Sequence, residues 1–91
     1  SRFQRAGWDV ARLARYVEEQ TGLGEGKLGQ RDARGGAGDA RKAFAYLAYR
    51  ELGATQVDAA CQLGVSSQAV SRMVLSGRAA VERLGISLPA P

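Results

Sequence analysis

Residues 56–75 read QVDAACQLGVSSQAVSRMVL, and this stretch determines the expected fold. Two short helices joined by a tight turn need a small residue where they cross, and Ala60 supplies it. Gly64 tolerates the positive φ that the turn requires, and Thr55 is a suitable N-cap for the first helix. The residues expected to pack beneath the turn and between the two helices are Val57, Leu63, Val65, Val70 and Met73. The spacing predicts a helix-turn-helix over residues 55–76.

The outward face of the second helix is expected to be polar. With Val70 and Met73 facing inward, that face carries Ser67, Gln68, Ser71, Arg72 and Leu75. Gln68 is suited to pair with adenine in a major groove, and Arg72 to read guanine or hold a phosphate. Hydroxyls that donate to phosphates or base edges are those of Ser66, Ser67 and Ser71. The open alternative is that the two helices simply pack within an α bundle of unrelated function.

Helical periodicity continues upstream of this stretch. Asp9 is a suitable N-cap for a helix that ends near Gly22, and its apolar residues are Val10, Leu13, Ala14 and Val17. Glu18 is expected to turn away from that apolar face. Residues 22–38 contain seven glycines and predict a loop, with one helical turn around Leu28.

Two further helical segments complete the pattern. Asp39 is expected to cap a helix over residues 40–52, which Gly53 ends at the C′ position. Downstream, apolar periodicity continues past Gly77, so a further helix or a bent continuation extends to about Gly85. No segment alternates apolar and polar residues over strand length. The expected fold is all-α, a compact bundle of five or six short helices.

The expected domain spans residues 9–85, with tails at 1–8 and 86–91, and it fits a fragment of a longer chain. At 91 residues, the chain has room for one core but not for a deep substrate cleft as well. It has no histidine and one cysteine, Cys61, which excludes imidazole catalysis, imidazole metal ligation and an internal disulfide. No catalytic or metal site is therefore expected. A cytoplasmic location is the simplest interpretation of the single thiol.

The positive charge is concentrated in one part of the chain. Thirteen basic and nine acidic residues give a net charge of +4, and residues 26–50 carry six basic residues against two acidic ones. Such a stretch is typical of a polyanion-binding surface, although a solvated surface without a partner has the same composition. Arg78, just after the predicted second helix, is a further candidate for phosphate contact.

Residues 40–77, ARKAFAYLAYRELGATQVDAACQLGVSSQAVSRMVLSG, resemble the C-terminal DNA-binding domain of the replication initiator DnaA. They are more similar to the DnaA-like domain appended to REP-associated tyrosine transposases, as the run AVSRMVLSGRAAVERLG at residues 69–85 indicates. The initiator family has an Asp-His-Thr-Thr type signature where residues 66–69 read SSQA. The resemblance implies a bacterial DNA-binding domain with a basic loop on the DNA backbone. The loop residues in this chain are Arg31, Arg34, Arg41 and Lys42.

The resemblance places catalysis outside these residues. The transposases use a tyrosine nucleophile and a metal bound by a His-hydrophobe-His motif in a separate domain, and this chain has no histidine. DNA, as duplex or hairpin, is the expected partner. No membrane, small-molecule substrate or cofactor is expected. Whether the chain forms a homodimer is left open. The alternative is a protein-interaction module that docks through the first helix and the face carrying Tyr46 and Tyr49.

Three other residue types or motifs have simpler interpretations. The string GEGKLG at residues 24–29 matches G-x-G-x-x-G, but no strand precedes it, so the match is attributed to chance. Cys61 is expected to be a small packing residue, and Trp8 to anchor the first helix to the core.

Overall fold

The computed structural model describes residues 2–24, 26–29 and 37–89. In chain order the elements are α1 (Arg2–Arg5), α2 (Val10–Thr21), the 3₁₀ turn η1 (Lys27–Gly29), α3 (Ala37–Leu47), the π-helical segment η3 (Ala48–Leu52), α4 (Gln56–Leu63) and α5 (Ser67–Leu84). No strand occurs within the described ranges, so the all-α class is confirmed. The prediction of five or six short helices is not confirmed, because α2, α3, α4 and α5 are the only helices of at least eight residues in these ranges.

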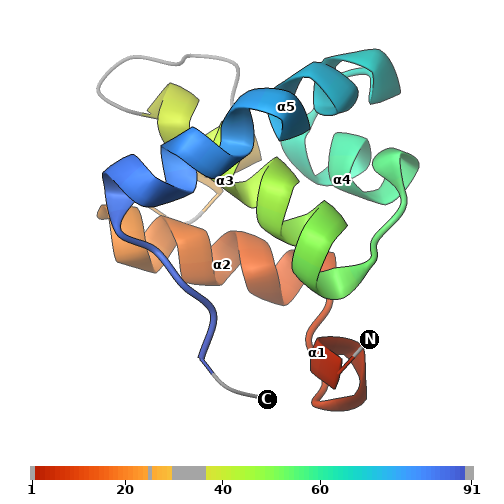
Figure 1. The fold of residues 1–91 in the computed structure, drawn as a ribbon, viewed down its shortest axis with the longest axis vertical. Helices are drawn as coiled ribbons and strands as arrows, with labels where there is room; N and C mark the ends of the chain where they lie inside the picture. The colour runs from red at the N-terminus through yellow and green to blue at the C-terminus, as the bar shows by residue number, and fades with distance from the viewer. Residues whose placement is uncertain (1, 25, 30–36, 90–91) are drawn as a thin grey trace.

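Helix α3 lies at the centre of the molecule. Figure 1 shows α5 crossing one side of α3, with α2 on the other side and α4 beside the N-terminal half of α5. The α3–α5 pair makes the most extensive contact among the described elements. The segment after α5 turns back along α2, where the hydroxyl of Tyr16 donates to the carbonyl of Ser87 at 2.5 Å.

The predicted helix ends around α2, α4 and α5 are confirmed. The carboxylate of Asp9 accepts from the Arg12 amide at 2.8 Å, and the hydroxyl of Thr55 accepts from the Asp58 amide at 3.1 Å. The C-terminal glycines of these helices adopt the left-handed conformation, which satisfies the last carbonyls without a Cβ penalty, and they are Gly22, Gly64 and Gly85. Local chemistry therefore determines where these three helices begin and end.

The start of α3 was predicted incorrectly. The helix begins at Ala37 rather than after Asp39, so Asp39 lies within the first turn and is not the cap. Its carboxylate instead pairs with Arg83 of α5. After Leu47 the chain continues as the π-helical segment η3, which Gly53 ends in the left-handed conformation as predicted.

Helix α5 is one continuous helix of 18 residues that passes through Gly77. Gly77 is buried against α3, where an added Cβ would overlap the Cβ of Tyr46 and lie 2.5 Å from the Lys42 carbonyl oxygen. The glycine therefore permits close helix packing, and the predicted break or bend near it does not occur.

The hydrophobic core joins all the helices. Its largest fully buried side chains are Phe44, Leu13, Leu28, Leu52, Leu63, Val17 and Val70. Phe3, Trp8 and Ile86 are also buried, so the core extends past both ends of the expected 9–85 domain. Trp8 packs edge-on against Phe3 and Tyr16, which confirms its predicted role as an anchor.

Three side chains face the opposite way from the prediction. Glu18 is buried, and its carboxylate accepts from the Leu28 amide at 3.0 Å, which holds η1 against α2. Val57 and Cys61 are exposed, although both were expected to pack. They share one stripe of α4 at i and i+4, and the side that faces the core carries Ala59, Ala60 and Leu63.

Among the described helices, none combines the length and apolar character that crossing a bilayer requires.

Candidate nucleic-acid interface

The connection between α4 and α5 spans three residues, Gly64 to Ser66. Gly64 has φ of 68°, and the next amide, of Val65, donates to the Ala60 carbonyl at 3.1 Å. Val65 is half-buried and packs against the core, as the sequence predicts. These contacts fix the direction in which the chain leaves α4.

Ser66 then sets the start of α5. Its hydroxyl accepts from the Ala69 amide at 3.2 Å, and its carbonyl accepts from the Val70 amide at the same distance. On the inner side of the pair, Leu63 and Val70 are fully buried and Met73 is partly buried. The N-terminal half of α5 is thus anchored at both its cap and its apolar face.

The outer side of α5 carries most of the predicted contact residues on one stripe. Gln68 and Arg72 are exposed and lie one helical turn apart. Ser71 is half-buried and its hydroxyl donates to the Ser67 carbonyl at 3.4 Å. Leu75, one turn further along, is 86% exposed. The side chains available to a ligand here are therefore an amide, a guanidinium and an apolar group.

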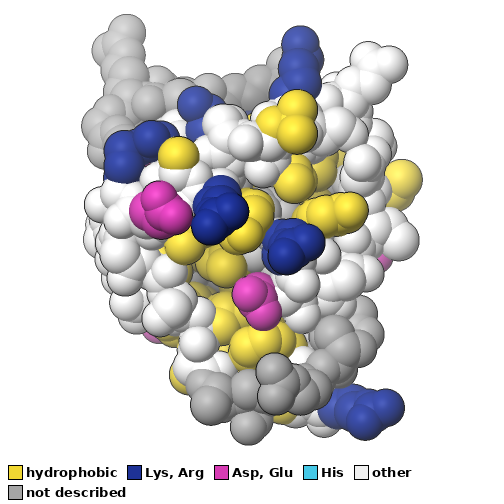
Figure 2. Space-filling view, viewed as in Figure 1, with side chains coloured by type: hydrophobic (Ala, Val, Ile, Leu, Met, Phe, Trp, Pro, Cys, Tyr) yellow, Lys and Arg dark blue, Asp and Glu magenta, His cyan; other side chains and the backbone are white. Residues whose placement is uncertain are grey.

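Arg78 extends this outer surface toward the C-terminal half of α5. Its guanidinium lies 3.6 Å from the Glu82 carboxylate, and its side chain is 78% exposed. An exposed pair of this kind contributes little to stability, so Arg78 is accessible to another anion. Figure 2 shows Lys and Arg side chains among apolar side chains on the face viewed, with Asp or Glu side chains beside some of them.

Arg41 does not join this surface. Its side chain is buried, and its guanidinium donates to the Leu63 carbonyl at 3.2 Å. The contact connects α3 to the last turn of α4, where carbonyls lack intrahelical partners. The structure thus gives Arg41 a role in holding the α4–α5 connection, which corrects the expectation that it faces the DNA backbone.

The remaining predicted basic residues have different positions. Lys42 is half-buried on α3, and its carbonyl lies beneath Gly77 of α5. Arg31 and Arg34 lie outside the described residues. The structure therefore brings Ser66, Ser67, Gln68, Ser71, Arg72 and Arg78 together on α5 and its cap, with Lys42 on the neighbouring helix.

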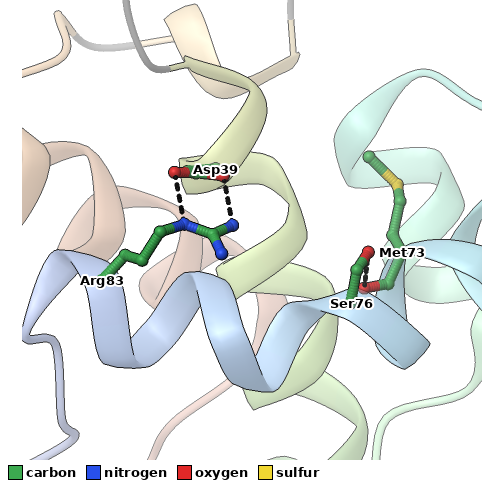
Figure 3. Close-up of polar contacts among 4 residues, drawn as sticks. All are labelled: Asp39, Met73, Ser76 and Arg83. Atoms are coloured by element: carbon green, nitrogen blue, oxygen red, sulfur yellow. Dashed lines mark hydrogen bonds and ion pairs between the residues drawn. The ribbon is translucent and has the colours of Figure 1, made fainter.

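An ion pair joins α3 and α5 at the far end of their contact. Two guanidinium nitrogens of Arg83 donate to the Asp39 carboxylate at 2.8 and 3.1 Å (Figure 3). The hydrogen bonds from Arg83 hold the pKa of Asp39 below its ordinary value, and the pKa of Arg83 is raised by the same bonds. Arg83 thus stabilises the packing of α5 against α3.

Gly29, in the described part of the glycine-rich stretch, contacts the C-terminal end of α4. Gly29 of η1 lies against the backbone of α4, where an added Cβ would be 3.1 Å from the Gln62 carbonyl oxygen. The carbonyl oxygen of Gly29 in turn lies 3.2 Å from the position of a Cβ at Gly64. The G-x-G-x-x-G string ends in this backbone packing, and no strand precedes it within the described residues.

A separate hollow of about 580 Å³ lies beside α2, away from α5, and is lined by Gly7, Trp8, Asp9, Ala11, Arg12, Arg15, Tyr16, Glu19 and Pro89. Arg12 is already engaged there: its guanidinium stacks 4.3 Å from the centre of the Trp8 ring and also donates to the Ala6 carbonyl. This hollow contains none of the predicted contact residues.

Sequence reasoning placed Leu75 on the outer face of α5 but did not include it among the contact residues. The signal was present in the helical period, because residue 75 follows Gln68 and Arg72 at i+7 and i+3. Its exposure makes it part of the candidate interface.

Comparison with known proteins yields no match to a protein-family model, a curated protein or a solved structure.

Proposed function

We propose that the chain is a duplex DNA-binding module. In this proposal α4, the turn and α5 act as a helix-turn-helix, and the N-terminal half of α5 enters the major groove. The support comes from the short, hydrogen-bonded connection through Gly64 and Ser66 together with the exposed stripe that begins at Gln68. A major groove about 12 Å wide admits one helix, and helix-turn-helix proteins read bases with the N-terminal residues of the second helix.

The observation that carries the proposal is the charge of α5. Residues 67–81 contain Arg72 and Arg78 and no Asp or Glu. Both arginines are exposed, and the N-terminus of a helix adds a partial positive charge. Glu82, near the C-terminal end of α5, is the one acidic residue of the helix and lies 3.6 Å from Arg78, so the N-terminal part of the helix is basic without a nearby carboxylate on the helix itself. Such a surface favours a phosphate-lined ligand over an acidic partner surface.

The proposed roles of the side chains follow from their reach. Gln68 pairs with adenine and Arg72 reads guanine or holds a phosphate, because both are long, exposed and on the groove side. Ser66 and Ser67 lie at the helix start, where hydroxyls and amides meet the backbone of DNA. Lys42 and the loop residues Arg31 and Arg34 are proposed to contact phosphates. Arg41 is left out because its guanidinium is used within the protein.

The resemblance described above supports a wider proposal. The chain is then the C-terminal targeting domain of a transposase-related or initiator-like bacterial protein. The support lies mainly in residues 40–85 and extends loosely upstream to about Asp9.

The test is selection of bound DNA from random duplex and hairpin pools, followed by affinity measurements on variants. Arg72→Ala and Gln68→Ala each remove one base contact, at about 1–3 kcal/mol, so the preference at one or two base pairs is lost. Arg15→Ala is the matched control, because Arg15 is an exposed arginine on α2, outside the proposed interface. If the α5 variants bind every sequence with the same affinity as wild type, the proposal is contradicted.

The alternative is a protein-interaction module without DNA contact. One observation favours it: Tyr49 is 52% exposed at the edge of a small hollow that Val74 also lines. Tyr46, the other residue expected on that face, is half-buried beneath α5. Binding that is insensitive to salt distinguishes an apolar interface of this kind from DNA binding.

A further inference from the structure

Leu75 is the most exposed large apolar side chain among the described residues, at 86%. The other large apolar residues of α5 are buried or pack against the core, and they are Val70, Met73, Val74, Val81 and Leu84. Leu75 points away from all of them, so it makes no contribution to the core. Its position on the outer stripe needs a separate explanation.

The neighbours of Leu75 on the helix surface are polar, basic or small. Ser71 and Arg72 precede it at i−4 and i−3, and Arg78 and the exposed Ala79 follow at i+3 and i+4. A single large apolar side chain between two exposed arginines fits a ligand that is anionic at its edges and has one small apolar group between them. The major groove of duplex DNA has this chemistry wherever a thymine places its 5-methyl group beside the phosphate backbones.

We propose that Leu75 contacts the 5-methyl groups of one or two thymines, so that the chain prefers thymine over cytosine or uracil at those positions. The inference rests on the proposed function, because it places α5 in the major groove. It adds a specificity-determining residue that contributes without a hydrogen bond. Burial of the methyl group against Leu75 supplies the preference, since removing apolar surface from water is favourable.

A second copy of the chain is a poorer occupant of the same surface. If two α5 helices met at Leu75, Arg72 of one helix would face Arg72 or Arg78 of the other, depending on their direction. Like charges that face each other across an interface are unfavourable. Glu82 neutralises Arg78 only in part, because it is itself exposed and 3.6 Å away. Charge complementarity therefore selects DNA.

The test uses the selected duplex and a series in which each thymine is replaced in turn by deoxyuridine, which removes only the methyl group. For wild type we expect about a fourfold rise in Kd at one or two positions and little change elsewhere. Leu75→Ala is expected to bind the thymine duplex about as weakly as wild type binds the uracil duplex, with no further loss on uracil substitution. Folding is not at risk, because Leu75 is exposed. Val57→Ala is the control, since Val57 is an exposed apolar residue on α4 and should keep the methyl effect.

The outcomes separate the two proposals. Duplex binding without a methyl effect, or with the same effect in wild type and Leu75→Ala, overturns the role of Leu75 and leaves the proposed function standing. A selected site that contains no thymine likewise overturns the role of Leu75 and leaves the proposed function standing. Failure of wild type to bind any duplex overturns the proposed function, and the inference with it.

Discussion

Gly77 of α5 lies so close to Tyr46 of α3 that no side chain fits between the two helices. An added Cβ would overlap that of Tyr46 and come within 2.5 Å of the Lys42 carbonyl oxygen. The close approach holds α5 against the central helix, and so it also positions the outer stripe that begins at Gln68. A residue on the buried side of α5 thereby determines where the contacts proposed on its outer side lie.

Gly77→Ala is expected to destabilise the protein, although alanine is the better helix former by about 1 kcal/mol. The added methyl group forces α5 away from α3, and overpacking of this kind costs about 1–3 kcal/mol. The measurement is the free energy of unfolding from urea denaturation followed by circular dichroism.

Ser76→Ala provides the control for Gly77→Ala. Ser76 is exposed on the same helix, and its hydroxyl makes only a long contact, at 3.5 Å, with the Met73 carbonyl. This variant should be as stable as wild type or slightly more so. If Gly77→Ala is also as stable as wild type, α3 and α5 do not pack as closely at Gly77 as described above.

Arg41→Met is expected to lower the free energy of unfolding by about 2–3 kcal/mol, because a charge-assisted hydrogen bond to the Leu63 carbonyl is lost. Met keeps much of the apolar stem, so the change isolates the guanidinium. The salt dependence of DNA binding should stay unchanged. Wild-type stability combined with a weaker salt dependence would instead place Arg41 at the DNA backbone.

The Asp39–Arg83 pair predicts a pH dependence of stability. The hydrogen bonds from Arg83 lower the pKa of Asp39 in the folded state, so the carboxylate stabilises the fold above its ordinary pKa of 3.8. This contribution is lost as the pH falls through the lower, folded-state value. Asp39→Asn should therefore melt below wild type between pH 5 and 7, and the gap in Tm should close below about pH 4. A gap that persists down to pH 2 would contradict this assignment.

The sequence predicted the features that depend on neighbouring residues. Asp9 and Thr55 were predicted as caps because an N-cap needs only a short polar side chain and the next turn of helix. The left-handed glycine at Gly64 follows from the same local rules. The direction of the outer stripe of α5 followed from its apolar period, since Val70 and Met73 face inward.

The features it did not predict depend on residues distant in the chain. Glu18 is buried because it binds the Leu28 amide, and Arg41 is buried because it binds the Leu63 carbonyl, 22 residues away. The sequence predicted a new helix or a bend past Gly77, since the partner of this glycine on α3 is not apparent from the period of α5. Each contact is known only once the helices are assembled.

The most direct test of the account is the affinity of the chain for duplex DNA at 50 and 200 mM salt, measured by fluorescence anisotropy with a selected duplex. Three or four phosphate contacts predict a Kd on the order of 100-fold weaker at the higher salt. Arg72→Ala should reduce this salt dependence if Arg72 holds a phosphate. No binding at 50 mM salt, or a Kd that changes by less than about twofold between the two conditions, would contradict the claim that α5 is a DNA-binding surface.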